Sequence, residues 1–243
     1  MERRTMALLA RNLGILFIMA PHTGSTAIGK VLLEDFGAQY LPEREALDAA
    51  GKSIPRKHTS LPQLIDSGIL DGAFDDPAER KRLVIVSTIR NPFDSNVSSW
   101  HRWYRKLDPN HVEFNPSFSD RARGSARQPP SDIEEARVDF EDWLTSRYQP
   151  SRLMRLRGQY KRAYTFRWTL GSDVVLQHEQ LQDGFDALLR AQGIKEKHEI
   201  PQVNVVRKPG RRYQDWYTAN SRAIVEGAFA DDVAEFGYRF EEG

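Results

Sequence analysis

Three short runs of aliphatic and β-branched residues stand out along the chain. They cover residues 14–19, 83–89 and 173–177. The first two are almost continuously apolar, which is the pattern of strands that are covered on both faces of a parallel sheet. We therefore predict three buried strands at these positions.

Each run is followed by apolar residues at helical spacing. These residues are Ile28, Leu32 and Phe36 after the first run, Val97, Trp100 and Tyr104 after the second, and Phe185, Leu188 and Leu189 after the third, where Gly193 is suited to end the helix. Helical patterns also cover residues 140–148, 153–160 and 224–229. Repeated strand–helix units predict an α/β fold, with a central parallel sheet in a three-layer α/β/α arrangement.

Length and composition narrow the class of protein. A chain of 243 residues is enough for one large domain, which we place at residues 1–243. The 35 Lys and Arg residues nearly balance the 34 Asp and Glu residues, so the net charge of +1 excludes a strongly basic nucleic-acid-binding protein. The absence of cysteine excludes a disulfide scaffold, thiol catalysis and cysteine-ligated zinc, and it fits a reducing compartment.

The N-terminal region resembles a secretory signal only in its order of basic and then apolar residues. Arg11 and Asn12 interrupt the apolar part, and residues 21–24 stand where a small-residue cleavage site would be. The longest apolar run, residues 14–20, is far shorter than the roughly 18 residues that a membrane span needs. We expect no membrane span and a cytoplasmic location.

One long stretch, residues 108–137, has a different composition. It contains four prolines among charged and small residues: Pro109, Pro116, Pro129 and Pro130. Because a loop of this length is usually either functional or mobile, we expect a lid over an acceptor pocket, with a mobile surface excursion as the alternative.

The loop after the first predicted strand has the features of an anion site. Residues 21–30 read Pro-His-Thr-Gly-Ser-Thr-Ala-Ile-Gly-Lys, in which a glycine turn leads into a helix. The free N–H groups and the positive dipole end of a helix start bind phosphate, and hydroxyl groups add donors. The residues expected to bind the anion from this pattern alone are Thr23, Gly24, Ser25 and Thr26. The alternative is that Thr23 or Ser25 simply caps the helix.

A nucleotide-triphosphate loop is a weaker interpretation of the same segment. Residues 24–30 match the first seven positions of GxxxxGK[ST], but Val31 at the eighth has no oxygen for magnesium. The second strand also ends without the acidic residue that such enzymes use to bind metal. Gly29 and Lys30 fall within the predicted helix.

A second candidate site follows the second strand. Arg90 lies at its carboxyl end, where open α/β sheets bind ligands, and Ser98 lies about two turns into the following helix. Pro92 suits the first turn of that helix. We expect Arg90 and Ser98 to converge on a second anion; the alternative is that Arg90 pairs with Asp94 or Asp35 while Ser98 packs.

Together the two loops resemble the sulfotransferases that use 3′-phosphoadenosine 5′-phosphosulfate (PAPS). The 5′-phosphosulfate loop of that family reads roughly Pro-Lys-Ser/Thr-Gly-Thr/Ser-Thr, and residues 21–26 are similar. Its 3′-phosphate element reads Arg-Asn-Pro-x-Asp-x-x-x-Ser, and residues 90–98 contain every fixed position. Further similar segments are residues 57–62, 178–181, 207–210 and 232–238.

The resemblance implies a P-loop nucleotide-hydrolase-like fold and transfer of a sulfuryl group to a hydroxyl or amine of a small-molecule or glycan acceptor. PAPS is then the donor, 3′,5′-adenosine diphosphate (PAP) is the product, and no metal is expected. Residues 22–26 would bind the 5′ end of the nucleotide. The residues implied at the 3′-phosphate are Arg90, Ser98, Arg207 and Lys208.

The resemblance also implies a catalytic histidine at His58, because residues 57–62 look like the family segment that carries it. An imidazole titrates near neutral pH and is a suitable general base for a hydroxyl group. Glu43 and Glu45 are the alternative bases.

His22 departs from the family pattern, which usually places lysine there to stabilise the leaving oxygen. A neighbouring phosphosulfate favours the protonated imidazole, so we expect His22 to donate to that oxygen. The alternatives are a displaced cation, Lys57 or Arg56, and a catalytically impaired nucleotide-binding module. The acceptor is not specified: the aromatic residues Trp100, Trp103, Tyr104 and Trp216 suit either a stacking surface or a core.

Overall fold

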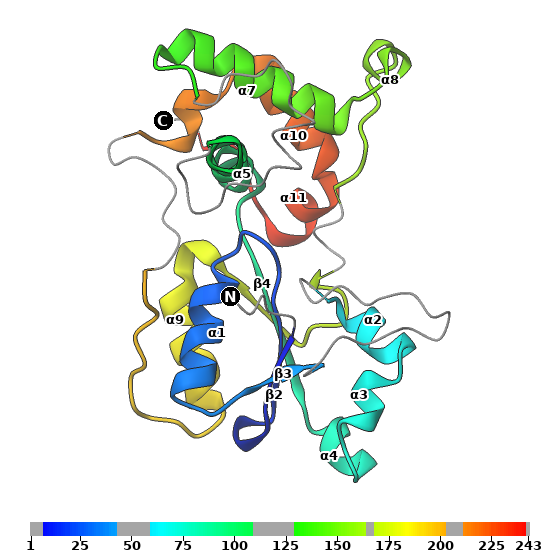
Figure 1. The fold of residues 1–243 in the computed structure, drawn as a ribbon, viewed down its shortest axis with the longest axis vertical. Helices are drawn as coiled ribbons and strands as arrows, with labels where there is room; N and C mark the ends of the chain where they lie inside the picture. Colours follow the sequence, from blue (N-terminus) through cyan, green and yellow to red (C-terminus); the bar gives the residue numbers. More distant parts are fainter. Residues whose placement is uncertain (1–6, 43–58, 109–128, 164–167, 203–210, 242–243) are drawn as a thin grey trace. The chain divides into compact units, whose positions relative to one another are not determined.

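The computed structural model describes residues 7–42, 59–108, 129–163, 168–202 and 211–241. The chain divides into two compact units, the first made of residues 1–90 and 165–203 and the second of residues 91–164 and 204–243. Figure 1 traces the elements of both units. The sequence predicts one domain over residues 1–243, and the structure distinguishes these two parts within it.

The first unit contains a sheet that is five-stranded in the described residues, with the order β3-β1-β2-β4-β5. The strands are β1 Ala7–Ala10, β2 Ile15–Ile18, β3 Gln39–Leu41, β4 Val84–Ile89 and β5 Val174–Gln177. The three predicted strands are β2, β4 and β5, and their parallel pairing confirms the prediction. β1 runs antiparallel to β2 and β3, so the sheet is mixed, and the predicted central parallel sheet is confirmed only for β2, β4 and β5.

A tight turn explains the antiparallel strand. β1 is entirely buried and leads into the short 3-10 helix η1, Arg11–Leu13. Gly14 then adopts a φ of 62°, in the left-handed region that favours glycine, and its N–H donates to the Arg11 carbonyl at 3.1 Å. The chain therefore reverses, so that Ala10 pairs with Ile15.

Helices cover both faces of this sheet (Figure 1). They are α1 Ser25–Glu34, α2 Leu61–Asp66, α3 Ile69–Gly72, α4 Pro77–Lys81 and α9 Leu181–Ala191, with the 3-10 helix η3 His178–Gln180 before α9. On one face, Ile28 of α1 and Phe185 of α9 pack in a cluster with Phe17. On the other, Leu64 of α2 belongs to a cluster with Ile18. The first unit is therefore an α/β structure with its sheet between helices.

The connections that follow β2 and β4 lead to strands at opposite edges of the sheet, to β3 and to β5. After β2 the chain passes through α1 to β3, and after β4 it continues through the second unit to β5. Since β2 and β4 are parallel neighbours, their carboxyl ends lie together at the point where the connections diverge. Open α/β sheets bind ligands at such a point.

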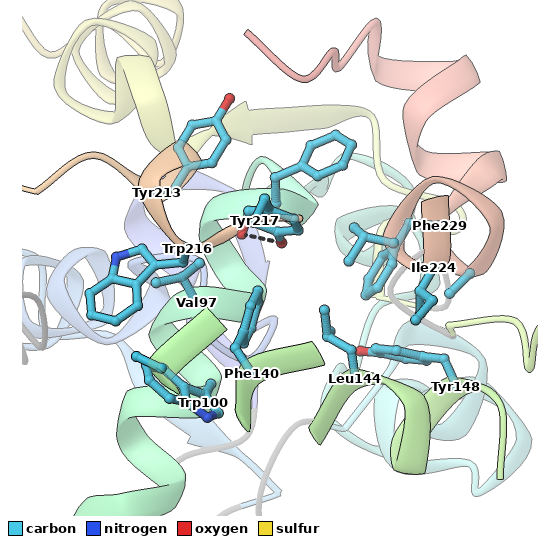
Figure 2. Close-up of a cluster of buried hydrophobic side chains, with 14 of the residues drawn as sticks. Val97, Trp100, Phe140, Leu144, Tyr148, Tyr213, Trp216, Tyr217, Ile224 and Phe229 are labelled. Atoms are coloured by element: carbon cyan, nitrogen blue, oxygen red, sulfur yellow. Dashed lines mark hydrogen bonds between the residues drawn. The ribbon is translucent and has the colours of Figure 1, made fainter. Parts of the chain in front are cut away.

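The second unit is helical and has an aromatic core (Figure 2). Its elements are α5 Pro92–Leu107, α7 Ile133–Tyr148, α8 Arg152–Leu156, η4 Tyr213–Trp216, α10 Ala219–Ala228 and α11 Ala230–Phe236. The Trp100 ring lies 5.2 Å from Trp216 and 5.6 Å from Phe140, measured between centroids. Trp100, Tyr104 and Trp216 are all buried here, which supports the interpretation of these residues as core.

The predicted loop at residues 108–137 is too long at its C-terminal end. Asp132 caps α7, because its Oδ1 accepts from the N–H of Glu134 at 2.9 Å and of Glu135 at 3.1 Å. Arg137 is helical and donates from Nε to the Asp215 carbonyl at 2.8 Å. Residues 109–128 lie outside the described residues, so the lid stays a prediction. No helix in the described ranges combines the length and the apolar composition that a membrane span requires.

Candidate functional site

The loop between β2 and α1 is held together by its own hydroxyl groups. Thr23 and Ser25 are buried, and both donate from their side chains to the carbonyl of Ala20, at 2.9 and 2.7 Å. The N-cap residue of α1 is Gly24, which has no side chain, so no side chain caps this helix. The interpretation of Thr23 or Ser25 as an ordinary helix cap is therefore wrong.

Since those two hydroxyl hydrogens are used inside the loop, the donors that remain for a ligand are mainly backbone groups. Along α1, the first backbone N–H that forms a hydrogen bond within the helix start is that of Ala27, which donates to the Gly24 carbonyl at 2.9 Å. Within the described residues, the amides of Gly24, Ser25 and Thr26 have no backbone acceptor, and the Thr26 side chain is exposed. These donors lie at the positive end of the α1 dipole, which favours an anion.

Gly24 is required at the turn for two reasons. Its φ is 80°, and a Cβ added to it would lie 2.8 Å from Nδ1 of His178 and 2.8 Å from Cδ2 of Leu181. His178, the first residue after β5, places Nδ1 3.3 Å from the Thr23 carbonyl. Because a carbonyl only accepts, Nδ1 is the protonated ring nitrogen. His178 thus supports the loop, although the sequence indicated only that it belongs to a family-like segment.

Thr88 joins the loop to the neighbouring strand. It is the second-to-last residue of β4, and its Oγ1 lies 2.5 Å from Oγ1 of Thr23. A hydroxyl group has one hydrogen, and that of Thr23 is donated to Ala20, so Thr88 is the donor of this bond. No pattern in the sequence singles out Thr88.

The guanidinium of Arg90 lies against the same loop. Its Nη1 donates to the His22 carbonyl at 3.3 Å, and its side chain is half-buried. His22 has a φ of 65°, which is uncommon for a residue other than glycine. The structure therefore brings residues 22–26 and Arg90 together at the ends of β2 and β4. Asp35, one of the alternative partners of Arg90, accepts from Nδ1 of His198 at 2.6 Å.

Gly29 and Lys30 do not form a phosphate loop. Both lie inside α1, as the helical pattern predicts. A Cβ on Gly29 would lie 3.0 Å from Cε of Met19 and 3.1 Å from Cδ1 of Leu8, so this glycine permits close packing of α1 on the sheet. Lys30 is half-exposed, and its Nζ lies 3.9 Å from Oε2 of Glu34, one turn further along the helix surface.

The Asn-Pro pair that follows Arg90 has a structural function. Asn91 caps α5, with its Oδ1 accepting from the Phe93 amide at 2.9 Å, and Pro92 is the first helical residue. The Phe93 carbonyl accepts from the Tyr217 hydroxyl at 2.9 Å (Figure 2). Ser98 is buried in the second turn of α5. Because Arg90 belongs to the first unit and Ser98 to the second, their convergence on one anion stays a prediction.

Several predicted residues lie outside the described part of the chain. They are Glu43, Glu45, Arg56, Lys57, His58, Arg207 and Lys208. Thr59 and Ser60, which follow His58, are buried, and the Ser60 amide donates to Oε1 of Gln63 at the start of α2. The assignments of the catalytic base and of two 3′-phosphate ligands therefore stay predictions.

Comparison of the chain with protein-family models, with curated proteins and with solved structures gave no match. Within the described ranges, no group of three or more His, Asp or Glu residues is placed to hold a metal ion. A functional assignment therefore rests on the residues of the two loops and on the contacts of the loop after β2.

Proposed function

We propose that this protein is a PAPS-dependent sulfotransferase with a P-loop nucleotide-hydrolase-like fold. The observation that carries the proposal is the position of Arg90, whose guanidinium donates to the His22 carbonyl beside the open amides of residues 24–26. These groups lie where the connections from β2 and β4 diverge, which is the usual ligand site of such sheets. A second support is the resemblance of residues 21–26 and 90–98 to the two nucleotide-binding elements of the family.

In this proposal the donor nucleotide is held by charge-assisted hydrogen bonds. The amides of residues 24–26 and the Thr26 hydroxyl bind the 5′-phosphosulfate at the start of α1. Arg90 supplies a planar pair of donors suited to phosphate or sulfate oxygens. The family resemblance assigns Ser98, Arg207 and Lys208 to the 3′-phosphate.

The reaction transfers a sulfuryl group in line. The acceptor oxygen or nitrogen forms a bond to sulfur, the bond from sulfur to the bridging phosphate oxygen breaks, and PAP leaves with that electron pair. His58 accepts the acceptor's proton. By analogy with phosphoryl transfer, catalysis consists mainly of positioning and of stabilising charge on the leaving oxygen, and protonated His22 donates to that oxygen.

An ATP-dependent kinase is the first alternative, and the position of Lys30 speaks against it. In a triphosphate loop the lysine stands where the loop meets the helix and reaches the phosphates, whereas Lys30 is in the second turn of α1 and its Nζ lies 3.9 Å from Oε2 of Glu34 on the helix surface. The second alternative, a nucleotide-binding module without catalysis, is favoured only by histidine in place of lysine at position 22.

Transfer of radiolabelled sulfate from PAPS to a panel of phenols, sugars, glycans and amines tests the proposal. We expect labelled product with the wild-type protein and a decrease in turnover of about a hundredfold or more in His58→Ala, with PAP affinity retained. The matched control is His198→Ala, because His198 pairs with Asp35 at the opposite end of α1. Binding of PAP without transfer to any acceptor would favour the inactive module, and the absence of PAP binding would remove the proposal.

A further inference from the structure

The segment that includes α8 concentrates positive charge in a chain that is nearly neutral. Residues 143–172 contain no Asp or Glu. The cationic residues of this segment are Arg147, Arg152, Arg155, Arg157, Lys161, Arg162 and Arg167. The nucleotide chemistry proposed above uses none of them. In Figure 1, α8 follows α7 at the outer edge of the second unit.

Two exposed leucines lie among these cationic residues. Leu153 is 54% exposed and Leu156 is 75% exposed, which is unusual for large apolar side chains placed next to one another. Residues three apart share one face of a helix, so these leucines form a single apolar ridge on α8. Met154 lies on the other side of the helix and is half-buried. The packed side and the exposed side of α8 are therefore distinct.

The cations around the ridge are available to a partner. Arg152 is the first residue of α8 and Arg157 is its C-cap, so these two cations flank the leucines in the chain, and Arg155 and Lys161 are also exposed. Arg162 pairs with Asp231 at 3.2 Å. Within the described residues no carboxylate forms an ion pair with Arg152, Arg155, Arg157 or Lys161.

We propose that this surface docks on the headgroups of an anionic lipid bilayer. We call it the α8 surface and define it by Arg152, Leu153, Arg155, Leu156, Arg157 and Lys161. The leucines enter the boundary between headgroups and acyl chains, and the cations pair with lipid phosphates and carboxylates. Clusters of about four to eight Lys and Arg on an amphipathic helix are typical of recognition of anionic lipid.

The apolar ridge favours a bilayer over two other polyanions. A nucleic acid offers phosphates, but it offers no apolar phase for Leu153 and Leu156, and single strands are usually bound by stacking aromatics. A stable protein interface needs roughly 800 Å² on each partner, which is a large area for a helix of five residues. Partition into a bilayer has no such threshold, because each buried leucine and each paired cation adds to it separately.

Co-sedimentation of the full chain with lipid vesicles tests the proposal. We expect binding to phosphatidylcholine vesicles that contain about 30% phosphatidylserine, no binding to pure phosphatidylcholine vesicles, and weaker binding at about 1 M salt. Replacing two cations, in R152Q/R155Q, should lower the partition coefficient by about twentyfold to thirtyfold, because each cation contributes about fivefold. Removing the ridge, in L153N/L156N, should lower it by about tenfold or more.

Two exposed positions elsewhere provide matched controls. Val138→Asn removes an apolar side chain that is 62% exposed on α7, and Arg190→Gln removes an exposed cation at the end of α9; both should bind vesicles like the wild type. Absence of wild-type binding to anionic vesicles would overturn the proposal, and so would undiminished, wild-type binding by both double variants. Binding of an oligonucleotide without binding of vesicles would reassign the surface to nucleic acid. Calorimetry with PAP should give wild-type affinity in L153N/L156N. Vesicle binding therefore tests the lipid proposal, PAP binding tests the sulfotransferase proposal, and either one can fail while the other holds.

Discussion

The hydroxyl groups of Thr23 and Thr88 lie 2.5 Å apart and join the loop after β2 to the end of β4. Both residues are buried, and Thr88 is the donor because Thr23 donates its own hydrogen to Ala20. Two hydrogen bonds of Thr23 therefore hold the loop, one to the Ala20 carbonyl within the loop and one to the Thr88 hydroxyl on the neighbouring strand. This leaves the amides at the start of α1 open to a ligand.

Thr88→Val should destabilise the protein and weaken binding of PAP. The substitution preserves shape but removes the donor, so the Thr23 oxygen loses a buried partner, and we expect a loss of about 1–2 kcal/mol in the free energy of unfolding. Thr88→Ser keeps the hydroxyl and should retain most of both properties. Urea unfolding and calorimetry measure the two effects. Wild-type stability and affinity in Thr88→Val would show that this bond does not hold the loop.

Gly24→Ala should abolish nucleotide binding, because the new Cβ meets His178 and Leu181. The matched control is Gly193→Ala. Gly193 also has a left-handed backbone, with a φ of 85°, but a Cβ added there would meet nothing within 4 Å. The control isolates the backbone penalty of about 1–2 kcal/mol, whereas Gly24→Ala adds a steric penalty of about 1–3 kcal/mol. Thermal unfolding and titration with PAP distinguish them. Equal behaviour of the two variants would contradict the close contact of Gly24 with His178.

Arg90→Ala should weaken PAP binding by about tenfold to a hundredfold, since a hydrogen bond to a charged group contributes about 1.5–3 kcal/mol. Arg90→Lys should recover only part of the affinity, because an ammonium group cannot bind two oxygens as a planar fork. Arg190→Ala, an exposed cation in the same unit, is the control and should bind normally. Equal loss in both alanine variants would indicate a general charge effect in place of a direct contact.

The second unit should unfold cooperatively in alkali. Burial raises the pKa of Tyr104, Tyr148, Tyr213 and Tyr217 above the ordinary value of 10.0, and the hydrogen bond from Tyr104 to Asp139, at 2.6 Å, adds to the shift. In the unfolded chain these phenols ionise near pH 10, so their contribution to stability is complete below about pH 10 and is lost as the pH rises above it.

Phenolate absorbance and circular dichroism, followed together from about pH 8 to about pH 12, test this expectation. We expect the buried tyrosines to ionise in the same transition in which helical structure is lost. Tyr104→Phe should make stability fall less steeply with pH. Ionisation of all tyrosines near pH 10 with the fold intact would contradict the assignment of these four residues to a buried core.

The strands that the sequence predicted are those whose own residues are sufficient to identify them. β2 and β4 are nearly continuous apolar runs, and β5 is a short β-branched run. β3 has only three residues, of which Gln39 is exposed and Tyr40 half-buried, and it becomes a strand by pairing with β1. β1 was missed because Arg11 and Asn12 interrupt the apolar region, and the structure shows that this interruption is the turn of a hairpin.

In the candidate site, too, the residues that could be predicted are those next to a strand that is recognisable from its own residues. Arg90 and the loop at residues 21–26 could be predicted because each directly follows a recognisable strand. Thr88 and His178 could not, because their contacts with Thr23 depend on the order of β2, β4 and β5 in the sheet. No local pattern contains that order, and a single histidine such as His178 is indistinguishable in sequence from a surface residue.

The most direct test of the central claim is calorimetric titration of the wild-type protein with PAP and, separately, with ATP and magnesium. We expect tight binding of PAP that is weakened in Arg90→Ala, and much weaker binding of ATP with magnesium. Tight binding of ATP with magnesium, and no heat of binding with PAP, would contradict this claim.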